Sequence, residues 1–262
     1  MIPEYIFNEL CDILYKNSGI IIKKGKQTLV INRLHNRLKF LEMDNYKDYL
    51  KYLKSYSTNN ELSIFIDCLS TNMTSLFREN HHFVHMNNVL KNNKSNKIKC
   101  WSSACSSGEE PYSIAMSAES ILNENFNKFK ILATDINRTV LEKANEGVYY
   151  NKDLCKIDSS LKLKYFKKKD DDSFKINDII RKSILFKNLN LNDKIPLGVN
   201  QFDFIFCRNV MIYFNKDLRQ KLINDISMFI KTDGYLYLGH ADSIGDLEHN
   251  FKSIGETIYK LK

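Results

Sequence analysis

Several common ways of stabilising a small protein or building a metal centre are missing from this sequence. Its six cysteines are scattered, and no two of them form a C-x-x-C pair. Structural zinc sites and disulfide frameworks require regularly spaced cysteines or histidines. We therefore expect no metal site and no disulfides, and we expect the cysteines to be reduced thiols in a cytoplasmic protein.

Long apolar runs are also missing. No run approaches the roughly 18 residues that a membrane-spanning helix needs. The first residues carry the acids Glu4, Glu9 and Asp12, and they lack the basic start and small-residue cleavage site of a targeting segment. The sequence therefore predicts that the chain begins with an amphipathic helix and does not insert into a membrane.

Glycine is scarce, with nine residues in 262, and the turn most suited to a nucleotide has only one. This turn, Ser102 to Gly108, lies between an expected strand at 97–101 and an expected helix at 109–122. Its small side chains would let a ligand approach the backbone closely. Glu109 and Glu110 open the helix, where they would repel a pyrophosphate. A cofactor without phosphate, such as S-adenosylmethionine, fits this turn better.

A second acid follows the next expected strand. The apolar segment 130–134 leads into Asp135. A carboxylate at the end of the second strand of such a fold commonly binds ribose hydroxyls. Glu110 and Asp135 together therefore indicate a cofactor that contains a nucleoside. The alternative is that both are ordinary helix-cap and turn acids.

The order of the expected elements divides the chain. Up to residue 70 we expect helices, at 5–15, 28–41, 45–53 and 60–68. Beyond residue 71, strands alternate with helices, which predicts an α/β fold with a mainly parallel sheet. The strands are expected at 97–101, 130–134, 184–186, 202–206, 234–238 and 256–261, and the helices at 109–122, 138–146 and 216–231. Sequence rich in lysine and aspartate predicts an insertion at about 148–187, with an exposed hairpin or loop at 167–172.

Another polar group follows the apolar strand 202–206. Arg208, Asn209 and Tyr213 lie at its end or just beyond it. The carboxyl ends of parallel strands form one edge of the sheet, and open α/β sheets bind their ligands there. We therefore expect these three residues to share that edge with Glu110 and Asp135.

Five segments together resemble one family: TNMTSLFRE, WSSACSSGEEPYSIAM, ILATDI, FDFIFCRNVMIYF and DGYLYLGHADS. Their order and spacing are similar to those of the CheR family of chemotaxis receptor methyltransferases, over nearly the whole chain. The resemblance implies a class I adenosylmethionine-dependent methyltransferase with a Rossmann-like sheet. It also implies an all-α, receptor-docking domain at 1–70 and a methyltransferase domain at 71–262. Within the latter, the linker 71–95 would contribute to the cofactor site, and the insertion would be a small β-subdomain.

The resemblance also implies roles for individual residues. Contacts with S-adenosylmethionine, or with its product S-adenosylhomocysteine, fall to Asn72, Thr74, Arg78, Glu110, Asp135, Asn190, Leu191, Arg208 and Asn209. Arg78 and Tyr213 match the positions nearest the transferred methyl group. Simpler alternatives are that Arg78 forms a structural bridge to Glu79 or Glu110, and that Tyr213 is a core aromatic. His81, His82 and His240 are expected to pack or form hydrogen bonds rather than act as bases.

The substrate that the resemblance implies is a glutamate side chain in the cytoplasmic helical domain of a methyl-accepting chemotaxis receptor. Glutamate has a reference pKa of about 4.3, so its carboxylate is ionised at neutral pH and can attack a sulfonium methyl group without a base. Catalysis would then consist mainly of positioning, and Arg78 could orient a carboxylate. In this context we expect the basic residues Arg33, Arg37 and Lys39 to dock onto the acidic receptor.

The insertion departs from the family pattern in one place. Some family members have a glycine-rich turn there, which is associated with docking to a tethering peptide at the C-terminus of the receptor. This chain instead has KKKDDDSFKIND at 167–178. We therefore expect the protein to find its receptor without such a tether.

An alternative function is that of a nucleic-acid methyltransferase. The net charge of +8 favours this alternative, because basic proteins attract polyanions. However, the sequence has neither a D-P-P-Y motif nor a Pro-Cys pair, and no aromatic and basic stacking platform stands out. An adaptor that binds the cofactor without catalysis would be expected to have lost Arg78, Asn209 or Tyr213. A small-molecule methyltransferase would need a lid over its acceptor rather than a basic helical domain.

Overall fold

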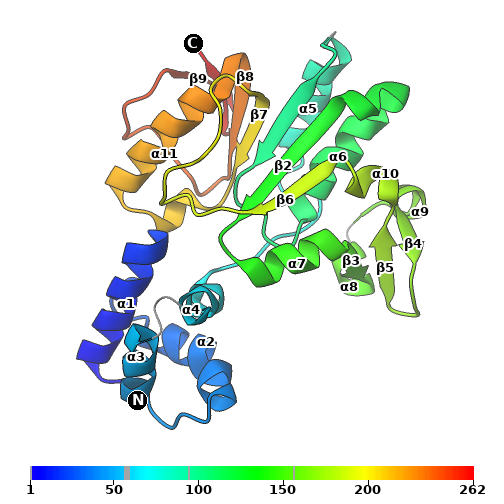
Figure 1. Cartoon of the computed structure of the whole chain (residues 1–262). Helices are drawn as coiled ribbons and strands as arrows, with labels where there is room; N and C mark the ends of the chain where they lie inside the picture. The colour runs from blue at the N-terminus through cyan, green and yellow to red at the C-terminus, as the bar shows by residue number, and fades with distance from the viewer. Residues whose placement is uncertain (1, 56–59, 94, 156) are drawn as a thin grey trace.

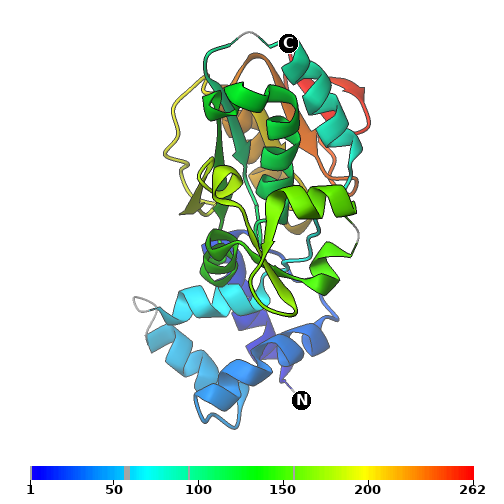
Figure 2. The same cartoon turned by 90° about the vertical axis from the view of Figure 1, so that its right-hand side faces the viewer.

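The computed structural model of this chain describes residues 2–55, 60–93, 95–155 and 157–262. Four N-terminal helices lie beneath a larger α/β part (Figures 1 and 2). They are α1 (Glu4–Ser18), α2 (Gln27–Phe40), α3 (Tyr46–Ser55) and α4 (Glu61–Leu69). The sequence predicts each of them, with ends that differ by a few residues. Among the described residues, no helix is both long and apolar enough to cross a membrane.

The N-terminal helices share a hydrophobic core, and a charged residue lies inside it. Glu61, at the start of α4, is 3% exposed. Its carboxylate accepts a hydrogen bond from Tyr49 Oη at 2.9 Å and two from the Arg37 side chain of α2. The hydrogen bond to Glu61 raises the pKa of Arg37. This ion pair therefore joins α2 to α4.

Arg33 has a similar place on α2. Its guanidinium donates hydrogen bonds to the carbonyls of Leu69 and Ser70 at the end of α4, and to Thr71 Oγ1 at 2.9 Å. Arg33 and Arg37, which the sequence suggests as docking residues, thus have intramolecular partners that the sequence does not indicate. Lys39, the third basic residue, is exposed.

The larger part is built on a seven-stranded sheet. Across the sheet, the strands are β6 (Ile184–Asn188), β2 (Phe129–Asp135), β1 (Ile98–Ser102), β7 (Phe202–Cys207), β8 (Ile230–Leu238), β10 (Ile258–Leu261) and β9 (Phe251–Gly255). The first five are parallel, and β10 is antiparallel to both of its neighbours. The strand order changes direction between β1 and β7, which is where such sheets bind ligands. The predicted α/β fold with a mainly parallel sheet is confirmed.

Helices cover the two faces of this sheet unequally. On one face lie α5 (His81–Lys91), α6 (Glu109–Leu122) and α7 (Arg138–Glu146). The short η1 (Asn123–Lys128) connects α6 to β2. On the other face, α11 (Lys216–Phe229) packs mainly against β7 and β8. No described helix covers β2 and β6 on that second face, and the loop 189–201 borders them there (Figure 1).

The insertion forms a small antiparallel sheet. Its elements are β3 (Val148–Tyr150), α8 (Asn151–Leu154), α9 (Ser159–Tyr165), β4 (Phe166–Lys168), β5 (Ser173–Ile176) and α10 (Asp178–Arg181). The strand order is β3-β5-β4, and the exposed residues 169–172 join β4 to β5. The predicted hairpin therefore exists, and it projects from the side of the molecule (Figure 1).

The structure corrects three expectations. The segment 71–95, predicted as a linker, contains the helix α5. The single strand expected at 256–261 is the shorter β10, and an additional strand, β9, precedes it. Glu256 and Thr257 instead form the turn between β9 and β10, with φ values of 50° and 57° that suit a tight hairpin turn. Finally, the helix expected to reach residue 231 ends at Phe229, because β8 begins directly after it.

Replacing Arg37 with methionine should destabilise the chain, because it leaves Glu61 buried without its cation. Breaking a buried ion pair in this way costs about 3–5 kcal/mol, and we expect the lower end because Tyr49 still donates to Glu61. Urea unfolding followed by circular dichroism would measure the loss. The control is Lys39→Met on the exposed face of α2, which should change the unfolding free energy by less than about 0.5 kcal/mol. Equal stability of the two variants would contradict a structural role for Arg37.

Candidate active site

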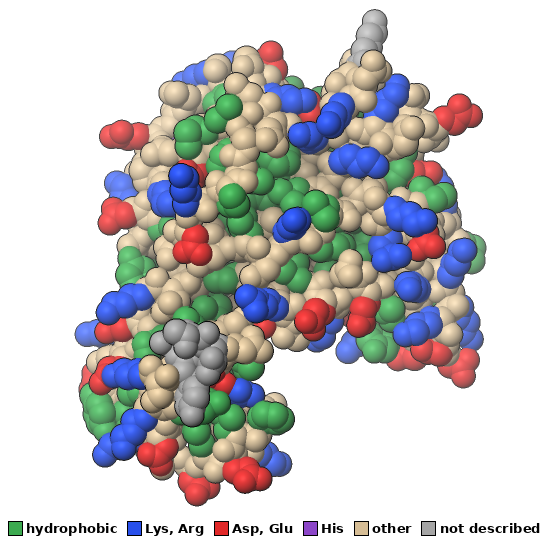
Figure 3. Space-filling model, viewed as in Figure 1, with side chains coloured by type: hydrophobic (Ala, Val, Ile, Leu, Met, Phe, Trp, Pro, Cys, Tyr) green, Lys and Arg blue, Asp and Glu red, His purple; other side chains and the backbone are tan. Residues whose placement is uncertain are grey.

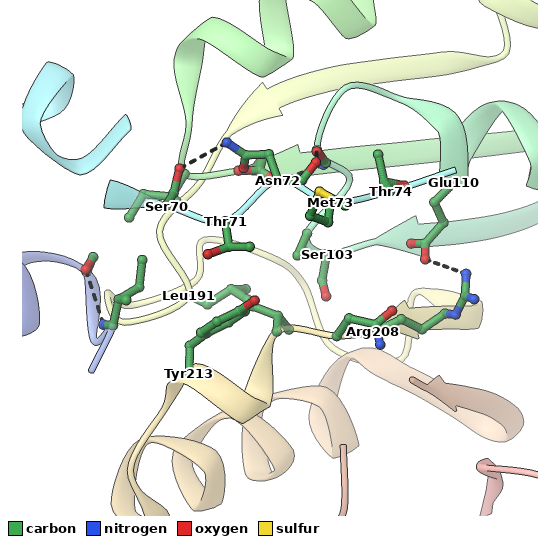
Figure 4. A pocket seen from close by; sticks show the side chains of 18 of the residues that line it. Ser70, Thr71, Asn72, Met73, Thr74, Ser103, Glu110, Leu191, Arg208 and Tyr213 are labelled. Atoms are coloured by element: carbon green, nitrogen blue, oxygen red, sulfur yellow. Dashed lines mark hydrogen bonds and ion pairs between the residues drawn. The ribbon is translucent and has the colours of Figure 1, made fainter. Parts of the chain in front are cut away.

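A pocket lies at the carboxyl ends of β1, β2 and β7, where the N-terminal helices meet the sheet (Figure 4). The empty space in the pocket, counted together with its open mouth, is about 910 Å³. Its walls come from the end of α1, the segment 70–78, the turn 103–110, the end of β2 and two loops that follow β6 and β7. Segments far apart in the sequence therefore build one cavity.

The structure brings the predicted site residues together. Lining this pocket are Asn72, Thr74, Arg78, Glu110, Asp135, Asn190, Leu191, Arg208, Asn209 and Tyr213. In Figure 4 the linker residues Thr71 and Met73 lie across the pocket from Tyr213. The predicted docking residues Arg33, Arg37 and Lys39 lie elsewhere, on α2.

Arg208, just after β7, lies between two carboxylates. Its side chain is 2% exposed; Nη1 is 2.8 Å from Oε2 of Glu110, and Nη2 is 3.1 Å from Oε2 of Glu79. Nη2 also donates to the backbone carbonyl of Arg78. Burial acts to raise the pKa of Glu79, but Arg208 and a hydrogen bond from the backbone N–H of His240 bring it below its usual value. Arg208 therefore ties β7 to the linker and to the start of α6.

Glu110 presents a carboxylate to the pocket from the first turn of α6. Oε1 accepts a hydrogen bond from Ser102 Oγ at 2.6 Å, and Oε2 accepts the one from Arg208. These two bonds fix the position of the side chain. Each oxygen keeps a further lone pair that can accept a hydrogen bond from a ligand.

Asp135 ends β2 with both carboxylate oxygens held by backbone groups. The N–H of Ser106 donates to Oδ2 at 2.8 Å, and the N–H of Asn137 donates to Oδ1 at 2.9 Å. Ser106 has a positive φ of 50°, which turns the small-residue loop back toward Asp135. Burial raises the pKa of Asp135, and the two N–H groups oppose that rise. The result is a fixed acceptor at the pocket wall.

Asp242, a residue that the sequence analysis does not single out, holds the turn after β7. Its carboxylate accepts hydrogen bonds from the backbone N–H groups of Asn209, of Gly239 at 3.1 Å and of Ile212 at 3.2 Å. Asn209 has a φ of 56°, and a Cβ on Gly239 would overlap its side chain. Asp242 belongs to the segment DGYLYLGHADS, which contributes to the family resemblance, but the sequence does not indicate the role of Asp242. Glu79 is a similar case, because the sequence suggests it only as a partner of Arg78 and does not indicate its ion pair with Arg208.

His82 lies near Arg208, fully buried in α5. Its Nε2 is 3.1 Å from Thr257 Oγ1 and 3.2 Å from the carbonyl of Glu256. Burial, together with Arg208, lowers the pKa of His82 to about 3, so the ring is neutral at physiological pH. His82 does not line the pocket, in agreement with the expected packing role.

Arg78 and Tyr213 face the pocket with more freedom. The Arg78 side chain is 38% exposed, donates to the carbonyl of Met73 at 3.0 Å, and approaches Glu79 only to 3.9 Å. Glu110 pairs with Arg208 instead. Tyr213 lies at the end of the short helix η2 (Met211–Tyr213) and is partly exposed. Both side chains line the pocket and are partly exposed, so both are accessible to a ligand.

The last turn of α1 forms part of the pocket wall through Ser18 and Ile20 nearby. The final carbonyls of a helix have no partner within the helix. Here Asn190 Nδ2 donates to the carbonyl of Asn17 at 2.8 Å. Asn192 Nδ2 donates to the carbonyl of Lys16 at 3.3 Å. The side-chain amide of Asn190, which the resemblance places beside the cofactor, thus caps a helix of the N-terminal group.

The segment after α1 also contacts the turn that carries Tyr213. The backbone N–H of Ile21 donates to the carbonyl of Tyr213 at 2.9 Å. Asn215 Nδ2 donates to the hydroxyl of Tyr15 at 2.6 Å. Gly19 has a φ of 74°, and a Cβ there would overlap Leu218 of α11. The N-terminal helices therefore help to position Tyr213.

The hydrogen-bonding groups and the apolar side chains of the pocket fit S-adenosylmethionine. Asp135 can accept hydrogen bonds from ribose hydroxyls, and Glu110 offers an acceptor to a cationic amino group. Ile136, Leu189 and Leu191 provide apolar surface for a base. The described residues that line the pocket include no glycine and no lysine to cradle a phosphate.

Comparison with known proteins gives two family matches. Residues 6–70 match the model "CheR methyltransferase, all-alpha domain", and residues 72–260 match "CheR methyltransferase, SAM binding domain". The chemotaxis protein methyltransferase of Borreliella burgdorferi is 40% identical over 248 residues, which cover 90% of this chain and 87% of that protein.

The chemotaxis protein methyltransferase of Escherichia coli is 34% identical over 258 residues, covering 97% of this chain and 90% of that protein. Chemotaxis protein methyltransferase 1 of Vibrio cholerae is 31% identical over 272 residues, covering 100% of this chain and 98% of that protein. These matches give no support to the nucleic-acid alternative. The chain belongs to the CheR family of S-adenosylmethionine-dependent chemotaxis methyltransferases.

Proposed function

We propose that this protein transfers the methyl group of S-adenosylmethionine to glutamate side chains of a chemoreceptor, forming methyl esters. The observation that carries the proposal is the convergence of residues from all but the last of the recognised segments on one pocket at the carboxyl edge of the sheet. Asp242, from the last segment, does not line the pocket but accepts hydrogen bonds from the backbone N–H groups of Asn209 and Ile212, in the turn after β7. The names of the relatives agree with this function.

In this proposal the pocket holds the cofactor through fixed acceptors. Asp135 accepts hydrogen bonds from the ribose hydroxyls, and Glu110 accepts them from the amino-acid part. The bound cofactor supplies an electrophilic methyl group on a sulfonium centre. The remaining contacts are assigned to Asn72, Thr74, Arg78, Asn190, Leu191, Arg208 and Asn209. For Asn190 we assign the contact to the backbone and Cβ, because its amide caps α1.

The acceptor needs positioning rather than activation. A glutamate carboxylate is already the nucleophile at neutral pH, since its reference pKa is about 4.3. We therefore propose a transfer that uses neither a general base nor a metal. Arg78, at the mouth of the pocket, orients the carboxylate through charge-assisted hydrogen bonds. Tyr213 places its hydroxyl near the reacting atoms, from a turn held by Ile21 and Asp242.

We propose that residues 1–70 dock onto the cytoplasmic helical domain of the receptor, and that residues 71–262 carry the reaction. Exposed Lys39 contributes directly to docking. Arg33 and Arg37 contribute by holding the shape of this surface, because their side chains already bind α4 and the linker. We further propose a cytoplasmic enzyme, which its six free cysteines suit, and one that binds its receptor without a tethering peptide.

Methyl transfer to a receptor fragment tests this function. Labelled S-adenosylmethionine, the enzyme and the cytoplasmic fragment of a chemoreceptor should give label in the receptor, and mild alkali should release it as methanol because a carboxyl methyl ester hydrolyses readily. A receptor fragment whose acceptor glutamates are replaced by alanine is the control. Alkali-stable label, or label on RNA or DNA only, would contradict the proposal.

Two variants separate cofactor binding from turnover. Asp135→Ala removes an acceptor of charge-assisted hydrogen bonds and should weaken S-adenosylhomocysteine binding by about 100-fold. Tyr213→Phe removes one hydroxyl and should leave that affinity within about threefold while lowering kcat by about 100-fold. Calorimetric titration and the transfer assay measure the two quantities. Unchanged affinity in Asp135→Ala, with its thermal unfolding also unchanged, would refute the ribose assignment.

The contact between α1 and Tyr213 can be tested with a matched pair of glycines. Gly19→Ala should displace either residues 18–21 or the Leu218 side chain, both of which lie next to the turn that carries Tyr213. We therefore expect kcat to fall by about tenfold, because a misplacement near 1 Å is costly in catalysis. Gly25 has a similar φ of 85°, but a Cβ there meets nothing within 4 Å. Gly25→Ala should therefore cause the same backbone strain as Gly19→Ala, about 1–2 kcal/mol, but its kcat should stay at the wild-type value. Equal kcat in both variants would show that α1 does not position Tyr213.

A further inference from the structure

A groove on the open face of the main sheet carries charge that the proposed active site does not use. It is lined by residues of β1, β2 and β6, by the loop 189–201 and by the start of β7. This is the face on which no described helix covers β2 and β6. Figure 3 views the molecule from the same side as Figure 1 and shows hydrophobic side chains in this region, with lysine or arginine side chains around them.

Four lysines surround the groove, namely Lys97, Lys99, Lys130 and Lys187, and no acidic residue is among the described residues that line it. Among the described residues, no carboxylate forms an ion pair with the side-chain ammonium group of any of these four lysines. Asp203, the acid next to this face, is held by Lys231 at 2.8 Å and by the backbone N–H of Lys99.

The strand register places two of these charges side by side. Lys99 of β1 is paired with Lys130 of the parallel strand β2, and Thr134 of β2 is paired with Lys187 of β6. Residues alternate between the faces of a sheet, so Lys99, Lys130 and Lys187 point to the same side. Like charges on paired positions destabilise a sheet. An anionic partner would relieve this repulsion.

The floor of the groove is aliphatic. It includes Leu132, Leu185, Leu189 and Leu197, and Leu185 is 56% exposed. Phe202 also lines the groove but is only 3% exposed, so its ring offers no platform for a base. Binding of single-stranded nucleic acid relies on such platforms. An aliphatic floor with a cationic border instead complements a protein segment that has one apolar face and one acidic face.

The groove adjoins the cofactor pocket. Leu189 lines both of them, at the point where the chain leaves β6. A protein whose acceptors are glutamates is acidic near the site of transfer, and this is the partner that the groove suits. We propose that the groove binds an acidic amphipathic segment of the protein substrate, as a contact separate from the one that places the acceptor glutamate. The identity of that substrate rests on the proposed function.

Charge reversal in the groove tests this. Lys130→Glu with Lys187→Glu should raise the KM for a chemoreceptor cytoplasmic fragment by about tenfold or more, while kcat and the KM for S-adenosylmethionine stay within twofold. The control is Lys252→Glu with Lys262→Glu, which makes the same change in net charge at the opposite edge of the sheet, on and near β9. Equal effects of the two double variants on the KM for the receptor fragment, or no effect of the first, would refute the proposal that the groove binds the protein substrate.

A binding measurement separates this inference from the proposed function. Hydrogen exchange of the full chain is followed with S-adenosylhomocysteine present, with and without the receptor fragment. The groove predicts slower exchange at 184–201 in the wild type and no such protection in Lys130→Glu with Lys187→Glu. Protection of 184–201 without methyl transfer would refute the proposed function but support a binding role for the groove. Methyl transfer without protection would refute that binding role. Protection by an oligonucleotide but not by the receptor fragment would also refute it.

Discussion

The guanidinium of Arg208 is the interaction on which the rest of the site depends. It lies between Glu79 of the linker and Glu110 of α6, at the end of the strand β7. A cation and two carboxylates that are almost fully buried tolerate only an arrangement in which each has its partners, because an unpaired buried charge costs several kcal/mol. The three segments that meet there consequently have little freedom to separate. The pocket walls follow from this junction, since Arg78, Asn209 and Thr74 lie within a few residues of it in the sequence.

A second set of contacts extends this scaffold to the N-terminal helices. The loop after β6 satisfies the last carbonyls of α1 with asparagine side chains, and the segment after α1 satisfies the carbonyl of Tyr213. These are backbone groups that would otherwise lack partners. The pocket is thus a property of the whole chain, and the turn that carries Tyr213 is held by residues from both ends of the sequence.

Much of this architecture was predictable, because local patterns determine it. The small-residue turn before α6, the acid at the end of β2 and the polar pair after β7 each come where an apolar strand ends, and parallel strands bring their carboxyl ends to one edge. The helix α5 was missed because HHFVHMNNVLK combines histidines and asparagines of weak helix propensity. The strand β9 was missed because, within it, only Phe251 is buried, so it lacks the alternation that marks a strand.

What the sequence could not predict are contacts between distant residues. The partner of Arg37 is a glutamate in another helix, and the amide of Asn190 binds a carbonyl 173 residues away. The resemblance assigns these residues to docking and to cofactor binding, but a motif does not reveal which atoms a side chain contacts. Asp242 is a comparable case, since its three backbone partners become neighbours only when β7 and β8 pair.

A pocket wall shared by two parts of a chain also has a thermodynamic consequence. If the position of α1 affects the affinity for the cofactor, then the bound cofactor must affect the position of α1 by the same free energy. Any partner that binds the N-terminal helices and shifts α1 would therefore change cofactor affinity, and cofactor would change the affinity for that partner by an equal factor. Binding of the cofactor and binding of that partner would then be coupled, without any dedicated regulatory site.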